Sequence, residues 1–181
     1  VFVYFALLGL AFLFVEIPLI QRWILVLKQP VYAFTLVVAT LLAFSGWGST
    51  LATSAWLPKR KAFSVLVLLA LVLPLLLTPL MDVSLRLPAW ARLVVAVLSL
   101  APLGFLMGLP FPFGVAWLNR HAPEMTPWAW AINGCASVVA SVLAAMLALS
   151  QGFLLVMLVG GAAYGGAFFV FSTQMVPLDG G

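Results

Sequence analysis

Long apolar runs separated by short polar stretches dominate the chain. A helix needs about 20 predominantly apolar residues to cross a hydrocarbon core about 30 Å thick. The runs are continuous, whereas the strands of an outer-membrane barrel alternate apolar and polar residues. The pattern therefore predicts an all-α fold, a polytopic transmembrane bundle of about six helices. The predicted spans are 2–27, 31–52, 62–81, 89–118, 127–150 and 152–174.

Proline, glycine and charged residues mark the ends of these spans. Residues 28–30, Lys-Gln-Pro, are predicted to end the first helix, because the residue before a proline disfavours the α region. Leu57-Pro58 ends the second, and residues 82–88 separate the third from the fourth. Thr126-Pro127 begins the fifth, and Ser150-Gln151-Gly152 turns into the sixth. Because these connections are short, consecutive helices are expected to be antiparallel neighbours within one transmembrane domain, 1–181.

Composition and charge agree with this fold class. Hydrophobic residues make up 66% of the chain and charged residues only 7%, whereas a soluble domain has about 25% charged residues. The net charge of +4 includes no long basic run, so it indicates membrane topology rather than nucleic-acid binding. One side would hold Lys59, Arg60, Lys61 and Arg120, and the other Lys28, Arg86, Arg92 and, if it reaches the interface, Arg22. A dense basic loop resists translocation, so both termini are predicted in the cytoplasm.

The start and end of the chain add further expectations. The first residue is Val1, and no charged segment or cleavage site precedes the first apolar run, so this run is not a signal peptide. We expect the chain to be a fragment of a longer protein, cut before a transmembrane helix. Residues 177–181 read as a frayed tail, and the single Cys135 cannot form an internal disulfide.

The fourth span contains the helix-breaking sequence PFPFG, residues 110–114. A continuous helix through it would lose backbone hydrogen bonds at both prolines. Such a break either marks the membrane edge, followed by a short interfacial helix, or lies at membrane depth and lines a cavity. The sequence leaves both alternatives open.

The first span carries polar residues inside an apolar run, in FVEIPLIQRWI, residues 14–24. Ionisable residues within the membrane typically mark ion paths, proton relays or substrate sites, so Glu16 is a candidate for a polar site inside the bundle. Alternatively, the helix ends near Gln21, and Glu16 is a structural carboxylate bonded to nearby backbone. Gln21 and Arg22 are further candidates, although neither shares a narrow helix face with Glu16.

Two other spans offer weaker candidates. The second ends in small and hydroxyl-bearing residues that include Ser45 and Ser49, typical of a helix-packing face. The fifth span carries small residues and one amide, that of Asn133, at every fourth position. This series predicts a packing face, or a ligand contact at Asn133. The members of the series are Ala129, Asn133, Ser137, Ser141 and Ala145. Gly161 and Gly165 form a GxxxG pair, a packing face in the sixth.

The sequence lacks the residue sets that several kinds of chemistry need. The only histidine, His121, falls in a short polar loop, and no metal-ligand spacing, nucleotide fingerprint or Ser/His/Asp set is present. We therefore predict no catalytic residue, no metal and no cofactor in this chain.

Three stretches in this order, residues 12–49, 101–114 and 127–153, resemble the membrane part of bacterial membrane-bound spermidine synthase-like proteins, also described as fused major-facilitator/spermidine synthase proteins. The matching positions include Glu16, Gln21, Arg22, Pro30, Tyr32, Ser45, Gly46, Gly48, Ser49, Pro110, Pro112, Gly114, Pro127, Trp128, Asn133 and Gly134. The resemblance implies a bacterial cytoplasmic membrane protein whose bundle, like half of a major-facilitator transporter, is joined to a soluble aminopropyltransferase- or methyltransferase-like domain. The loop GSTLATSAWLPKRK departs from the transporter pattern, because it lacks the Asp and the second Gly carried there.

Two functions follow as expectations. The first is a transporter-like bundle or membrane anchor that handles a polyamine or another small cation, with Glu16 as the counter-charge. The second is a purely structural or interaction module without a ligand. Expected partners are the lipid bilayer, the soluble domain of the same polypeptide, and a second helix bundle or another copy of the chain that encloses a cavity; nucleic acid is not expected.

Overall fold

The computed structural model describes residues 1–54 and 58–175. Six helical segments in these two ranges are long and apolar enough to cross a membrane, and the same ranges contain no strand. The chain is therefore an all-α, multi-pass membrane protein, as the hydropathy pattern predicts. The predicted helix end at Leu57 and the predicted tail at 177–181 lie outside the described residues.

The helices follow the predicted spans with two differences. Their bounds are α1 (Phe2–Leu27), α2 (Pro30–Leu51), α3 (Lys59–Leu85), α4 (Ala89–Met107), α5 (Pro110–His121), α6 (Thr126–Gln151) and α7 (Phe153–Val170), with a 3-10 helix, η1 (Pro123–Met125), before α6 and a π-helical turn, η2 (Phe171–Met175), after α7. The helix α3 is longer at both ends than predicted, because hydropathy detects only the part of a helix that is apolar. The predicted fourth span is two helices, α4 and α5, and His121 is the last residue of α5 rather than part of a loop.

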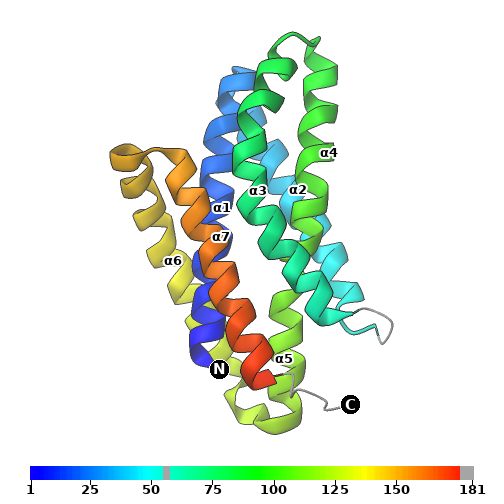
Figure 1. Ribbon diagram of the computed structural model, residues 1–181, viewed down its shortest axis with the longest axis vertical. Helices are drawn as coiled ribbons and strands as arrows, with labels where there is room; N and C mark the ends of the chain where they lie inside the picture. The colour runs from blue at the N-terminus through cyan, green and yellow to red at the C-terminus, as the bar shows by residue number, and fades with distance from the viewer. Residues whose placement is uncertain (55–57, 176–181) are drawn as a thin grey trace.

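The start of α1 and the end of the described chain, η2, lie at the same end of the bundle, the lower end in Figure 1, where the Val1 nitrogen is 3.3 Å from Gln174 Oε1. The start of α3, which carries Lys59, Arg60 and Lys61, and the end of α5, which carries Arg120, lie at this end as well. The connections from α1 to α2 and from α3 to α4 lie at the opposite end. The structure thus groups the basic residues of the loops as the sequence predicts.

The helix packing repeats within the molecule. In the first three spans, the first helix is α1, and it packs mainly on α6 and α7. In the last three spans, the first helix is α4, and it packs mainly on α2 and α3. The last helices of the two sets, α3 and α7, pack on each other. Each set has three spans, an odd number, so the first helix of the second set runs in the opposite direction to the first helix of the first set. Two sets with equivalent packing and opposite direction form an inverted repeat. The expectation that all consecutive helices are neighbours is wrong for α2 and α3, because α3 is held between α4 and α7 instead.

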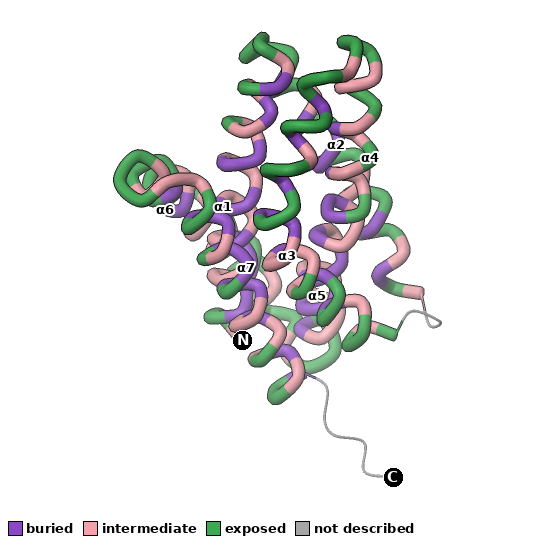
Figure 2. Tube along the Cα trace, turned by 45° about the horizontal axis from the view of Figure 1, so that its top comes forward, coloured by how far each residue is buried: buried purple, intermediate pink, exposed green. Residues whose placement is uncertain are grey.

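The core lies along α1, which contributes the fully buried side chains of Tyr4, Phe5 and Trp23. In contrast, α6 leaves most of its surface exposed in this chain (Figure 2). This difference follows from position, because α1 has helices on several sides and α6 packs chiefly on α1 and α7.

Candidate functional site

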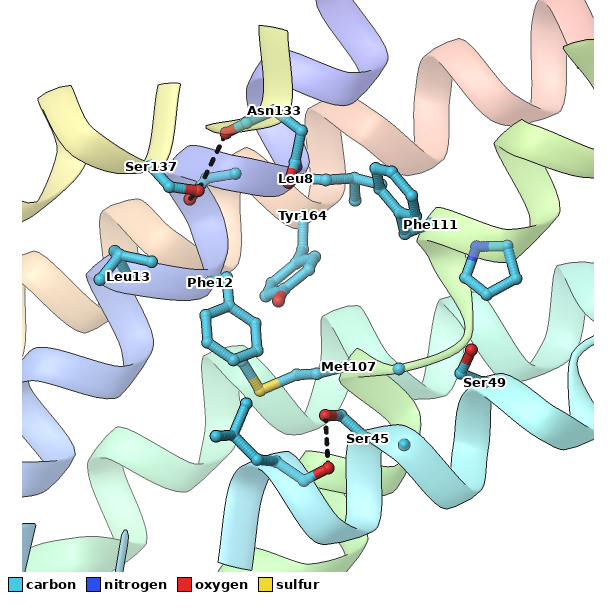
Figure 3. Close-up of a pocket in the computed structure, with 15 residues that line it drawn as sticks. Leu8, Phe12, Leu13, Ser45, Ser49, Met107, Phe111, Asn133, Ser137 and Tyr164 are labelled. Atoms are coloured by element: carbon cyan, nitrogen blue, oxygen red, sulfur yellow. Dashed lines mark hydrogen bonds between the residues drawn. The ribbon is translucent and has the colours of Figure 1, made fainter. Parts of the chain in front are cut away.

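A cavity of about 570 Å³ lies between α1, α2, the junction of α4 and α5, and α6 (Figure 3). Its lining residues are Leu8, Gly9, Phe12, Leu13, Leu42, Ser45, Gly46, Ser49, Met107, Gly108, Phe111, Pro112, Asn133, Ser137 and Tyr164. Gly9 is two helical turns, or about 10 Å, from the start of α1. The cavity is therefore nearer to the end of the bundle that holds Val1 and η2.

Two close helix pairs form opposite walls of this cavity, and glycine makes both approaches possible. A Cβ atom at Gly9 on α1 would collide with the backbone oxygen of Asn133 on α6. A Cβ atom at Gly108, at the end of α4, would collide with the backbone of Ser45 on α2. Small residues let transmembrane helices approach in this way. The two pairs, α1 with α6 and α4 with α2, are equivalent in the inverted repeat.

Hydrogen bonds across the α1–α6 contact use part of the polar surface of the cavity. Asn133 Nδ2 donates to the carbonyl oxygen of Phe5 at 3.0 Å. The Ser137 hydroxyl lies 3.2 Å from the carbonyl oxygen of Gly9 and 2.9 Å from that of Asn133. The packing role predicted for this stripe is confirmed at Asn133 and Ser137. Ala145 is exposed, because an i+4 series drifts around a helix whose period is 3.6 residues.

Tyr164 of α7, a buried residue, brings its hydroxyl to the wall of the cavity. The residue is only 1% exposed, and its ring lies between Phe12 and Phe111 in Figure 3. Within residues 1–54 and 58–175, no hydrogen bond is formed by this hydroxyl. Because this hydroxyl faces the cavity, water or a ligand there can bond to it.

The helix break of the fourth span also lines the cavity. The helix α4 ends at Met107 and α5 begins at Pro110, where a proline in the first turn costs no hydrogen bond. The Tyr4 hydroxyl donates to the Pro110 carbonyl oxygen at 2.5 Å and fixes the start of α5 against α1. Each of the two interpretations of PFPFG has a counterpart in the structure: the break lines a cavity, and a short helix, α5, follows it. The interruption falls at Gly108-Leu109, just before the first proline.

Glu16 is half-buried and lies within an uninterrupted helix, since α1 continues through the buried Pro18 to Leu27. The interpretation in which this helix ends near Gln21 is therefore wrong. Glu16 forms neither a hydrogen bond nor an ion pair with any residue that the structure describes. It follows the cavity residue Phe12 by four positions, which places it one turn further along the same face of α1.

The structure brings together only some of the predicted site residues. Ser45, Ser49 and Asn133 line the cavity from two different helices, and Glu16 lies one turn beyond it. Gln21 is exposed and Arg22 is half-buried, and neither lines the cavity. Both are more than a turn beyond Glu16 along α1, towards the end of the bundle opposite to Val1 and η2.

Sequence reasoning missed Tyr164, Phe12 and Phe111 as cavity residues. They lie in apolar runs, where an aromatic side chain gives no signal about which way it points. A weak signal existed at Gly9, because an isolated glycine in an apolar helix often marks a close helix approach.

The charge distribution limits the chemistry of the cavity. None of the described residues that line it carries a charged side chain. Among the described residues, no group of three His, Cys, Asp or Glu side chains is placed to hold a metal ion. The site can bind a ligand through oxygen atoms and aromatic rings, with one carboxylate nearby. The chain matches no protein-family model, no curated protein and no solved structure.

Proposed function

We propose that this chain is a transporter-like membrane domain whose cavity binds a small organic cation, with polyamines as the leading class. The observation that carries the proposal is the set of oxygen atoms and aromatic rings that line the cavity, among them the Tyr164 hydroxyl, which has no hydrogen-bond partner among the described residues. A ligand amine in the cavity could donate a hydrogen bond to this hydroxyl.

The free groups around the cavity favour a cation over an anion. Asn133 uses its amide nitrogen to bind Phe5, so its side-chain oxygen remains available to accept a hydrogen bond. Ser49 and Tyr164 provide further oxygen acceptors, and the rings of Phe12, Phe111 and Tyr164 offer faces that attract a cation. Glu16, one turn away, supplies the counter-charge that an ammonium group needs in a medium of low dielectric constant.

The packing of the helices supports a transporter-like architecture. Inverted repeats of three helices are nested within each six-helix half of major-facilitator transporters, whose substrates bind near the repeat interface. Here the cavity lies between the two equivalent helix pairs of such a repeat. The broken fourth span agrees with this proposal, because helix breaks at membrane depth occur where the backbone is buried in protein or lines a cavity.

A purely structural module fits these features less well. Such a module would have a dry, fully packed interior with Glu16 bonded to protein groups. Instead, the cavity is large enough for a small molecule, and Glu16 has no bonded partner within the described ranges.

The predicted link to spermidine synthase-like proteins is part of the proposal and has its own test. The full reading frame of the gene should encode a soluble domain of the SAM-binding type next to this segment. A frame without one would leave the cation site as a proposal for an independent membrane protein.

The cation site is tested by measuring spermidine binding to the purified chain in detergent, by calorimetry and by thermal unfolding. Spermidine should bind and raise the unfolding temperature. Tyr164→Phe removes one hydrogen bond and should weaken binding by about three- to tenfold. The matched control is Tyr32→Phe, since Tyr32 is 67% exposed on α2 and should tolerate the change. The proposal fails if spermidine does not bind, or if both variants bind as the unaltered protein does.

Glu16→Gln tests the counter-charge separately. Loss of the Glu16 carboxylate should reduce affinity for spermidine by at least about 30-fold, abolishing the thermal stabilisation. Asp82→Asn is the matched control, because Asp82 is an exposed carboxylate on α3 and its loss changes the net charge equally. Equal affinity in Glu16→Gln and the unaltered protein would remove Glu16 from the mechanism.

A further inference from the structure

A second, smaller cavity lies at the end of the bundle that holds Val1 and η2. It measures about 260 Å³ and is lined by residues of α3, α5 and η2: Lys59, Phe113, Ala116, Trp117, Arg120, His121, Phe171 and Met175. None of these residues lines the cavity around Tyr164.

The lining of this second cavity is divided into an apolar floor and a basic rim. Phe113 and Phe171 are buried and stack with ring centroids 5.8 Å apart, and Met175 is also buried. The rim carries Lys59, at the first position of α3, and Arg120, in the last turn of α5. None of the described residues that line the cavity is acidic.

Aromatic contacts hold the basic side chains at the rim. Lys59 Nζ lies 5.8 Å from the centroid of the Phe113 ring. The His121 ring stacks on Trp117 at 4.4 Å, and His121 Nδ1 lies 2.9 Å from the Trp117 carbonyl oxygen. The Nε2 atom of His121 is thereby left for another partner. Three nitrogen-bearing side chains from two helices that are distant in sequence thus surround one opening.

Positive charge is concentrated at the start of α3, which favours binding of an anion there. Lys59, Arg60 and Lys61 occupy the first turn of this helix, and no acidic residue or side-chain cap is present there. The helix dipole places partial positive charge at the same point, so it repels the three cationic side chains. A bound anion would relieve both effects.

We propose that this cavity binds the phosphate-bearing headgroup of an anionic membrane lipid. The basic rim would bind the phosphate, and the floor of Phe113, Phe171 and Met175 would contact the apolar part of the lipid next to the headgroup. Basic pockets between transmembrane helices on the cytoplasmic side bind lipid headgroups in this way. An anionic lipid has both a phosphate and an apolar part, whereas a soluble anion would leave the apolar floor without a partner.

The experiment measures the unfolding temperature of the purified chain in a neutral detergent with three additions: phosphatidylglycerol, phosphatidylcholine or inorganic phosphate. Phosphatidylglycerol should raise the unfolding temperature by several degrees, and the other two should raise it much less. No rise with phosphatidylglycerol, or an equal rise with phosphatidylcholine, overturns the proposal. An equal rise with inorganic phosphate also overturns it, by assigning the cavity to a soluble anion.

Matched variants separate this site from general charge effects. Arg120→Gln should raise the apparent dissociation constant for phosphatidylglycerol by about five- to tenfold. Arg86→Gln at the opposite end of the bundle should leave it unchanged, since both residues are exposed at helix ends and both changes remove one positive charge. An equal loss in both variants would show that the lipid responds to net charge alone and would overturn the site.

Discussion

At the scale of single residues, glycines decide how closely the walls of the central cavity approach. Gly9 has no space for a Cβ atom beside the backbone of α6, and Gly108 has none beside α2. By contrast, Gly134, next to Asn133 on α6, has nothing within 4 Å of a Cβ position. Two glycines on facing helices therefore have opposite roles, one in close packing and one on an open surface.

This contrast gives a matched pair of variants. Gly9→Ala should lower the free energy of unfolding by about 1–3 kcal/mol, because the added methyl group pushes α1 away from α6. Gly134→Ala should leave stability unchanged or raise it by about 0.5–1 kcal/mol, since alanine is the better helix former. Unfolding in detergent, followed by circular dichroism, measures both. Equal stability of Gly9→Ala and Gly134→Ala would contradict the close contact.

At the scale of elements, the ends of the helices follow local chemistry that the sequence already contains. Lys28-Gln29-Pro30 ends α1 and starts α2, as predicted, with Pro30 in the first position of the new helix. The unexpected feature is Lys28, which takes the left-handed conformation with φ 59°. Glycine is the usual residue in this conformation, because a Cβ atom is unfavourable there.

Lys28→Gly should therefore raise the free energy of unfolding by about 1 kcal/mol. Gln29→Gly is the control: Gln29 has an extended backbone with φ −136°, so glycine there only adds freedom to the unfolded chain and should lower stability. Thermal unfolding of both variants decides the matter. A Lys28→Gly variant no more stable than the unaltered chain would contradict the left-handed helix end.

At the scale of the whole molecule, an inverted repeat organises the bundle and places the polar groups. The two halves of three spans pack through α1 with α6 and α4 with α2, and the central cavity lies between these pairs. The connections carrying Lys28 and Arg86 lie at one end, and those carrying Lys59 and Arg120 lie at the other. The same arrangement brings the basic rim of the second cavity to the end with Val1 and η2.

This topology can be measured with single cysteines in a Cys135→Ser background. Gln29→Cys and Glu124→Cys place exposed thiols at opposite ends of the bundle. If the end with Val1 and η2 is cytoplasmic, a membrane-impermeant maleimide should label Gln29→Cys in intact cells and Glu124→Cys only after permeabilisation. Labelling of both variants in intact cells would contradict the arrangement of the spans.

The sequence by itself determined the fold class and nearly all span positions. Backbone polar groups in lipid must be bonded within their own helix, so any sufficiently long apolar run forms a helix whatever its neighbours are. Turn chemistry at Pro30 and Pro127 is equally local. The division of the fourth span could be foreseen from Pro110 and Pro112, but its position at Gly108-Leu109 could not, because Gly108 is set by contact with α2.

The tertiary structure alone decided which polar groups meet. Ser45 and Asn133 are 88 positions apart in sequence and face one cavity, whereas Gln21 and Arg22, close to Glu16 in sequence, lie away from it. Hydropathy fixes where a helix crosses the membrane, but the rotation of each helix about its axis depends on side-chain packing against its partners. For this reason FVEIPLIQRWI marked a polar helix, and only the packing of α1 against α6 and α7 left Glu16 half-buried and Gln21 exposed.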